Sequence, residues 1–162
     1  MKKRIGSYPR VRIEGDGRTV VSQAGGVLLV ETVRKAGLDT AISAALTPWR
    51  KARAVHDPGK VLLDAALAVA LSGDCLDRTA QNRIWLEIVQ IALDLLAWMP
   101  MLALTGEARL WEPRRLRLRL FTTAGQLVTT GRRRILRLAR HWPWTGHIIA
   151  ALDRLTQLPD PG

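Results

Sequence analysis

An arginine-rich stretch contains the residues whose types and spacing are best suited to bind a ligand. Between residues 107 and 142, ten arginines stand against Glu107 and Glu112, so the stretch carries a net charge of +8 (ten minus two). Arginine suits phosphate because its guanidinium stays charged and presents a fork of donors. We expect nine of these side chains to bind nucleic acid: Arg114, Arg115, Arg117, Arg119, Arg132, Arg133, Arg134, Arg137 and Arg140. The alternative is a solvated basic face that serves only solubility.

The charge of the whole chain also indicates a polyanionic partner. The 162 residues include 25 Lys and Arg against 14 Asp and Glu, which gives a net charge of +11. A domain this basic most often binds nucleic acid and less often a membrane surface. Contacts to phosphate would position the protein without reading the base sequence.

Two acidic residues have the spacing of a possible metal site. Glu87 and Asp94 are seven residues apart and therefore share one face of a predicted helix, where both could contact one divalent cation. They alternate with Arg83 and Gln90 in a narrow polar stripe, which is typical of a solvated helix face. We favour the solvated face, and we predict no metal ligand and no cofactor in this chain.

Other kinds of site are weakly indicated. Gly25-Gly26 precedes a predicted helix, but no dinucleotide or Walker pattern is present, so close backbone packing is favoured over phosphate binding. The single Cys75 excludes an internal disulfide, and the three histidines are too scattered for zinc. We therefore predict no catalytic residue. Five tryptophans are expected to be packing anchors: Trp85, Trp98, Trp111, Trp142 and Trp144.

The N-terminal elements follow from local signals. Alternation over residues 10–22 around a Gly-Asp-Gly turn predicts a β-hairpin. A helix is expected over 24–36, with Leu28, Leu29, Thr32 and Val33 on one face and with Gly37 as a left-handed cap. A short helix over 40–46 follows. Asp57 is then an N-cap with Pro58 at the first helical position, and the helix to Leu71 is apolar enough to be buried nearly all round.

The longest predicted helix begins after Thr79 and runs at least to Trp98, with Pro100 just beyond it. Residues 84–104 include a span long and apolar enough to cross a membrane. Glu87 and Asp94 lie inside it, however, and each would cost about 2.5–3.5 kcal/mol at membrane depth. A core helix is the favoured interpretation. The N-terminus is basic without an apolar core region, so we expect no secretory signal and a cytoplasmic location.

The arginine-rich region contains two ambiguous motifs. Residues 113–121 alternate Arg and Leu, yet Pro113 and the strong helix formers also suit a helix that opens there. Residues 131–140 favour a strand, and a short amphipathic helix is expected from Pro143 or Thr145. The fold class expected from these elements is mainly α with a small β component (α+β).

Two long blocks of the sequence carry a family resemblance. Residues 19–76, with HDPGKVLLDAALAVALSGDCL at their end, resemble the opening segment of actinobacterial insertion-sequence transposases with a DDE domain of group 1. Residues 77–158 resemble the closing segment through TAQNRIWLEIVQIALDLLAWMPMLAL, WEPRRLRLRLF and GRRRILRLARHWPW. We therefore divide the chain into segments 1–76 and 77–162, which join near Cys75 to Asp77.

The resemblance implies a remnant of a ribonuclease-H-like fold that lacks its central sheet. In the intact family three acids hold two Mg²⁺ or Mn²⁺ ions for DNA cleavage and strand transfer. Two of those acids belong to the missing middle, so the resemblance implies DNA binding without catalysis, and it assigns no catalytic residue here. Uncovered apolar helices would favour a homo-oligomer or pairing with a full-length transposase. A regulatory DNA-binding or transposase-inhibiting module is the alternative, and a basic protein at a membrane surface is a third.

Overall fold

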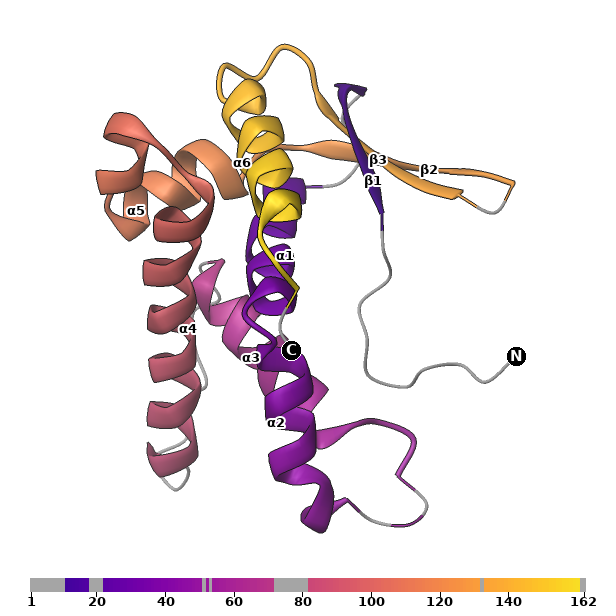
Figure 1. The fold of residues 1–162 in the computed structure, drawn as a ribbon, viewed down its shortest axis with the longest axis vertical. Helices are drawn as coiled ribbons and strands as arrows, with labels where there is room; N and C mark the ends of the chain where they lie inside the picture. The colour runs from indigo at the N-terminus through magenta and orange to yellow at the C-terminus, as the bar shows by residue number, and fades with distance from the viewer. Residues whose placement is uncertain are drawn as a thin grey trace.

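The first and last parts of the chain meet in a three-stranded sheet. The computed structural model describes residues 11–17, 22–50, 52, 54–71, 82–131 and 133–160. Strand β1 (Arg12–Gly17) is parallel to the central strand β3 (Arg133–Ala139), and β2 (Gly125–Thr130) is antiparallel to β3 on its other side. The sheet is small beside the helices, which confirms the mainly α fold with a small β component (Figure 1).

The hairpin expected around the Gly-Asp-Gly sequence is not formed. Strand β1 continues through Gly15–Gly17 and pairs with β3, while residues 18–21 lie outside the described part. An isolated two-stranded hairpin is marginally stable in water. Pairing with β3 instead places Ile13 beside Leu136 and against the core. The gain in apolar contacts explains why the distant partner prevails over the local turn.

Three helices follow β1. A 3-10 turn (Ala24–Gly26) leads into α1 (Val27–Lys35), then come α2 (Leu38–Leu46) and α3 (Pro58–Ala70). The predicted apolar face of α1 is confirmed, since all four of its residues are buried: Leu28, Leu29, Thr32 and Val33. Gly37 has a φ of 67°, the left-handed conformation predicted for the residue between α1 and α2.

The side chain of Asp57 caps α3 as predicted. Its Oδ1 accepts hydrogen bonds from the backbone N–H of Lys60 at 3.1 Å and from the hydroxyl of Ser43 on α2 at 3.0 Å. Burial raises the pKa of this carboxyl. The hydrogen bonds and the nearby Arg50 lower it by more, so the net pKa lies below the ordinary value of 3.8. The prediction that α3 is buried nearly all round was wrong for one face of the helix, because Val61 and Ala68 on that face are exposed to solvent.

Helix α4 (Asn82–Ala103) reaches Trp98 as predicted, but Pro100, which was expected just beyond the helix, lies inside it. It continues past Pro100, whose ring removes one backbone hydrogen bond and normally interrupts a helix at a cost of about 3 kcal/mol. Burial of Leu96, Met99 and Ala103 on the same face explains why the helix persists. Thr79, its predicted N-cap, lies outside the described residues.

One side of α4 is apolar and exposed. Leu86, Leu93 and Met101 are each more than half exposed, and Leu95, Leu96 and Met99 on the opposite side are in the core. Within the described residues, Trp85–Ala103 is long and apolar enough to cross a membrane by length and composition alone. Because α4 packs on α1, α3 and α6, we describe it as a core helix that is covered on one side only.

The C-terminal part begins with a 3-10 segment (Gly106–Leu110) and α5 (Pro113–Leu116), which continues as one π-helical turn (Arg117–Phe121). The motif at Pro113 is therefore helical, and the motif at residues 131–140 is a strand, as favoured. Helix α6 (Thr145–Gln157) packs on α1, α4 and β1. One core of buried side chains includes residues from both segments of the chain, from Leu28 and Leu63 to Leu120 and Ile148.

The 3-10 turn contacts the π-helical turn through backbone atoms. A Cβ placed on Gly25 would lie 1.7 Å from the carbonyl oxygen of Leu120 and 2.6 Å from its carbonyl carbon. Such contacts are impossible without a shift of the backbone. The prediction that Gly25-Gly26 serves close packing is confirmed at Gly25.

Replacement of Gly25 by Ala should destabilise the protein by roughly 1–3 kcal/mol, because backbone must move to admit the methyl group. Gly146→Ala is the matched control. Nothing lies within 4 Å of a Cβ at Gly146, and an alanine in the first turn of α6 should stabilise by up to about 1 kcal/mol. Urea unfolding followed by far-UV circular dichroism measures both. Equal free energies for the two variants would contradict the close contact.

Replacement of Asp57 by Ala should cost about 1 kcal/mol of stability at neutral pH, the usual effect of losing an N-cap. Because folding lowers the pKa of Asp57, its contribution is present above about pH 4 and is lost as the pH falls through the lowered pKa. The unfolding free energies of Asp57→Ala and the wild type should therefore converge in acid. Asp64→Ala, on the exposed side of α3, is the control and should cost less than about 0.5 kcal/mol.

Candidate nucleic-acid interface

Five of the nine arginines expected to bind nucleic acid are exposed to solvent. Two lie on α5, two at the start of β3 and one just after β3: Arg114, Arg115, Arg133, Arg134 and Arg140. Hydrogen bonds or ion pairs from these five to other described residues are not found. Arg132 lies outside the described residues. The five exposed guanidinium groups are therefore available to an anionic partner.

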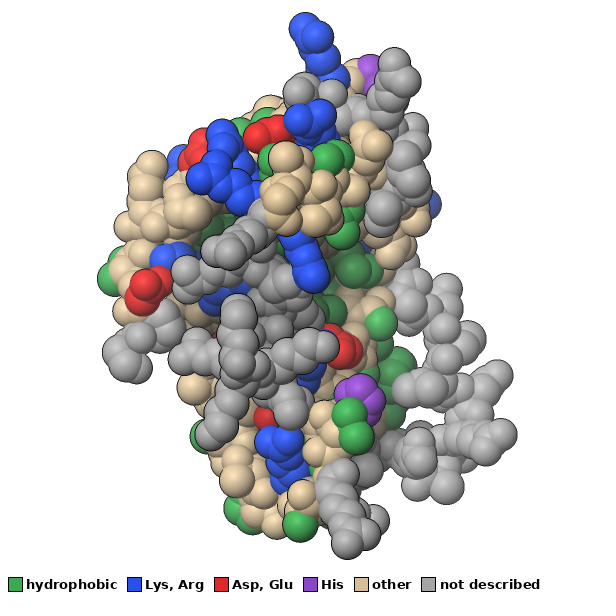
Figure 2. Space-filling model, turned by 90° about the vertical axis from the view of Figure 1, so that its right-hand side faces the viewer, with side chains coloured by type: hydrophobic (Ala, Val, Ile, Leu, Met, Phe, Trp, Pro, Cys, Tyr) green, Lys and Arg blue, Asp and Glu red, His purple; other side chains and the backbone are tan. Residues whose placement is uncertain are grey.

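The structure does not gather the exposed arginines into one patch. Figure 1 places α5 and the tip of the β2–β3 hairpin on opposite sides of the molecule, with α1 and α6 between them. The side that faces the viewer in Figure 2 carries most of its Lys and Arg side chains in the upper half, at the height of the sheet in Figure 1. Two separate pairs, Arg114-Arg115 and Arg133-Arg134, replace the single cluster that the sequence suggested.

Arg117 is held by the end of α3. Its Nε donates to the carbonyl oxygen of Ala70 at 2.8 Å, and its Nη2 donates to that of Val69 at 3.2 Å. The last carbonyls of a helix have no partner within the helix and carry partial negative charge, which favours a cation there. Arg117 therefore caps α3 and joins the two segments of the chain.

Arg119 lies against two tryptophan rings. Its Cζ is 4.6 Å from the ring centroid of Trp111 and 4.6 Å from that of Trp144. The two rings meet edge to face with centroids 5.0 Å apart, and His147 stacks on Trp111 at 5.9 Å. A guanidinium in this position is stabilised by the negative faces of the rings. Arg119 thus holds the start of α6 against the 3-10 segment that precedes α5.

Arg137 on β3 forms an ion pair with a residue of β1. Its Nε lies 3.3 Å from Oε2 of Glu14, the residue opposite it in the β1–β3 register. Glu14 also pairs with Arg12 at 3.3 Å. Since the two strands come from opposite ends of the chain, this ion pair supports the fold, and Arg137 differs in this respect from Arg133 and Arg134.

The two acids considered as metal ligands lie on α4. Glu87 is exposed, and Asp94 accepts a hydrogen bond from Nε2 of Gln90 at 3.1 Å, as expected for a solvated stripe. The side chain of Arg83 lies outside the described part. Among the described residues no group of three His, Cys, Asp or Glu side chains could hold a metal ion.

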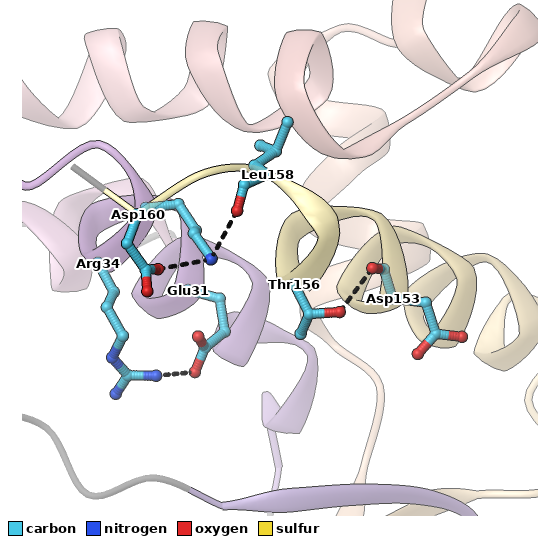
Figure 3. Close-up of polar contacts among 7 residues, drawn as sticks. Glu31, Arg34, Asp153, Thr156, Leu158 and Asp160 are labelled. Carbon is cyan, nitrogen blue, oxygen red and sulfur yellow. Dashed lines mark hydrogen bonds and ion pairs between the residues drawn. The ribbon is translucent and has the colours of Figure 1, made fainter. Parts of the chain in front are cut away.

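A cleft of about 520 Å³ lies between β1, α1 and α6. Its cations are already paired: Arg12 with Glu14, Arg34 with Glu31, and Lys35 with Asp160 at 2.8 Å. Figure 3 shows the pair of Arg34 with Glu31 and the contacts made at Asp160 and Leu158. Lys35 donates to the carbonyl oxygen of Leu158 at 3.0 Å. An anion in this cleft would compete with carboxylates, so the cleft is a poorer phosphate site than the exposed arginines.

The group of Trp111, Trp144, His147 and Arg119 was not predicted as a unit. The tryptophans were expected to be packing anchors, and the burial of Trp111 to 7% exposure confirms this role for it. Trp98, at 36% exposure, is a weaker anchor. The tryptophans near the arginine-rich helix in the sequence were a usable signal. One of the two rings that contact Arg119, that of Trp144, lies just before α6, 25 residues further along the chain (144 minus 119).

Two stretches of the chain, residues 3–80 and 75–160, match a family model described as transposase DDE domain group 1. Together they span nearly the whole chain, and they overlap at residues 75–80. This match confirms the family resemblance of the sequence. No curated protein and no solved structure matches the chain.

Removal of the Arg119 guanidinium should reduce stability without weakening binding to nucleic acid. We expect Arg119→Met to lower the free energy of unfolding by about 1 kcal/mol, because the cation–π contacts with two partly desolvated rings are lost. Arg115→Met, at an exposed position on the same helical region, should stay within about 0.5 kcal/mol of the wild type. Urea unfolding provides the measurement. A neutral effect of Arg119→Met would contradict the proposed role of the ring contacts.

Proposed function

The chain belongs to the transposase DDE domain group 1 family, and we propose that it is an internally shortened insertion-sequence transposase that binds DNA but does not join DNA strands. The observation that carries this proposal is the match in two blocks that meet at residues 75–80. The join that we place near Cys75 to Asp77 falls in the same interval. In the resemblance described above, two of the three catalytic acids belong between these blocks.

The exposed apolar surface of the helices next to the join supports the internal shortening. Helices α3 and α4 flank the interval and pack on each other. Val61 on α3 and Leu86 and Leu93 on α4 are each more than half exposed. Apolar side chains this exposed on two adjacent helices are typical of surfaces that another element covers. A central sheet is the element that the family fold would supply there.

The carboxylates of the described residues do not fit the metal chemistry of the intact family. Its Mg²⁺ or Mn²⁺ ions need several converging carboxylates. Glu87 and Asp94 lie on a solvated face, and Asp94 is bonded to Gln90. We therefore assign no catalytic step to this chain and propose that no strand transfer occurs.

DNA binding is the activity that the charges support. From Pro113 to Leu152 the sequence contains nine arginines and no acid, and five of those arginines are exposed. Guanidinium groups without acidic neighbours bind phosphates and release the counterions of DNA. We propose a cytoplasmic location for this binding.

We expect the protein to bind duplex DNA with an affinity that falls as salt rises. Each phosphate neutralised should contribute about −0.9 to the slope of log K against log salt concentration. Fluorescence anisotropy with a labelled duplex measures the slope, and vesicles of anionic lipid test the membrane alternative. A flat salt dependence, or binding to vesicles alone, would contradict the proposal. Metal-dependent nicking of supercoiled plasmid would contradict the absence of catalysis.

The exposed side of α4 favours a second candidate function, a module that inhibits a full-length transposase by pairing with it. Leu86, Leu93 and Met101 form an apolar surface along this helix, and such a surface is a common site of protein association. Co-expression with an intact transposase should then lower transposition, and Leu93→Glu should relieve the inhibition. Unchanged transposition frequency would exclude this function.

A further inference from the structure

The β2–β3 hairpin extends beyond the rest of the sheet as a two-stranded ribbon. Toward the tip of the hairpin, the pairing of β3 with β1 extends only as far as Ile135, which lies opposite Arg12. Beyond it, Arg134 pairs with Thr129 and Arg133 pairs with Thr130, and β1 contributes no described residue there. Figure 1 shows this end of the hairpin projecting to the right, away from all the helices. The tip is therefore accessible from both faces of the ribbon.

All described side chains at the end of the ribbon are polar and exposed. Thr129 and Thr130 on β2 and Arg133 and Arg134 on β3 are exposed, whereas Leu138 at the other end of β3 is fully buried. Successive residues of a strand point to opposite faces. Arg133 with Thr130 and Arg134 with Thr129 thus place one guanidinium and one hydroxyl on each face. Acidic residues do not occur between Glu112 and Asp153, so the charge is not neutralised within the ribbon.

We propose that the tip of this ribbon enters the major groove of DNA, with Arg133 and Arg134 contacting base edges or the adjacent phosphates. The inference rests on the DNA binding proposed above and names the element that carries it. Paired strands lie about 4.8 Å apart, and with side chains on both faces the ribbon fills a groove about 12 Å wide. The minor groove of undistorted B-DNA, about 6 Å wide, would have to widen to admit it. Arginine and threonine supply the donors and acceptors that major-groove edges accept.

The ribbon differs from the other exposed arginines in shape. Arg114 and Arg115 lie on α5, a helix of four residues packed against the body of the protein. A short helix of this kind can contact the phosphate backbone but does not reach into a groove. The two pairs carry the same charge, so a comparison between them separates groove insertion from simple charge attraction.

The experiment compares Arg133→Gln/Arg134→Gln with the matched variant Arg114→Gln/Arg115→Gln. Binding is measured by anisotropy on a plain duplex and on the same duplex with glucosylated hydroxymethylcytosine, which fills the major groove. For the wild type and the α5 variant, we expect glucosylation to weaken binding about tenfold or more, within the range of groove contacts. The ribbon variant should bind plain DNA about tenfold or more weakly and should be insensitive to glucosylation. Distamycin, a minor-groove ligand, should compete with none of the three.

The outcomes separate this inference from the proposed function. Wild-type protein that binds both duplexes equally, or that distamycin displaces, would overturn the ribbon inference and leave DNA binding intact. An equal loss of DNA affinity in the two variants, with no effect of glucosylation, would show that charge attraction alone drives binding and would overturn the ribbon inference. No binding of the wild type to any duplex would overturn both. The measurements on the wild-type protein need no substitution, so they test the groove insertion even if the ribbon variant does not fold.

Discussion

The approach of Gly25 to the carbonyl of Leu120 sets the position of the N-terminal segment on the C-terminal segment. Only a glycine allows the two backbones to lie this close. Arg117, one turn before Leu120, then reaches the end of α3, and Phe121, next to Leu120, is buried in the core. On the other side, a Cβ on Gly125 would lie 2.9 Å from that of Ala24, so β2 starts against the same turn. The helices and the sheet are both aligned by this contact.

Local signals in the sequence predicted the helical part of the fold. The apolar face of α1, the left-handed Gly37 and the cap at Asp57 depend on residues within about one helical turn of each other, and the structure contains all three. The exceptions depend on distant residues. Strand β1 pairs with β3 and does not form the predicted hairpin, and α4 continues through Pro100. In both cases packing against the core outweighs the local preference. No pattern over a short stretch of sequence contains that information.

The arginines show the same limit at the candidate site. Their type and their clustering indicated an anionic partner, but each of the three that has a structural role finds its partner far along the chain. Arg117 contacts the carbonyl of Ala70, Arg119 contacts Trp144, and Arg137 contacts Glu14. Some arginines of this run in the sequence therefore support the fold, and the others are exposed to solvent. The exposed pairs owe their separation to the path of the chain between α5 and β3.

The parallel pairing of β1 with β3 also has a consequence for synthesis of the protein. Glu14 and Arg137 are 123 residues apart, so β1 cannot pair with β3 until the residues between them have left the ribosome. Contacts of such long range slow folding, because a large loop must close before they contribute any stability. Helix α6, which packs on α1 and α4, also comes after β3 in the chain, so the surfaces that it covers stay exposed until then. Apolar surface that is exposed during folding promotes aggregation.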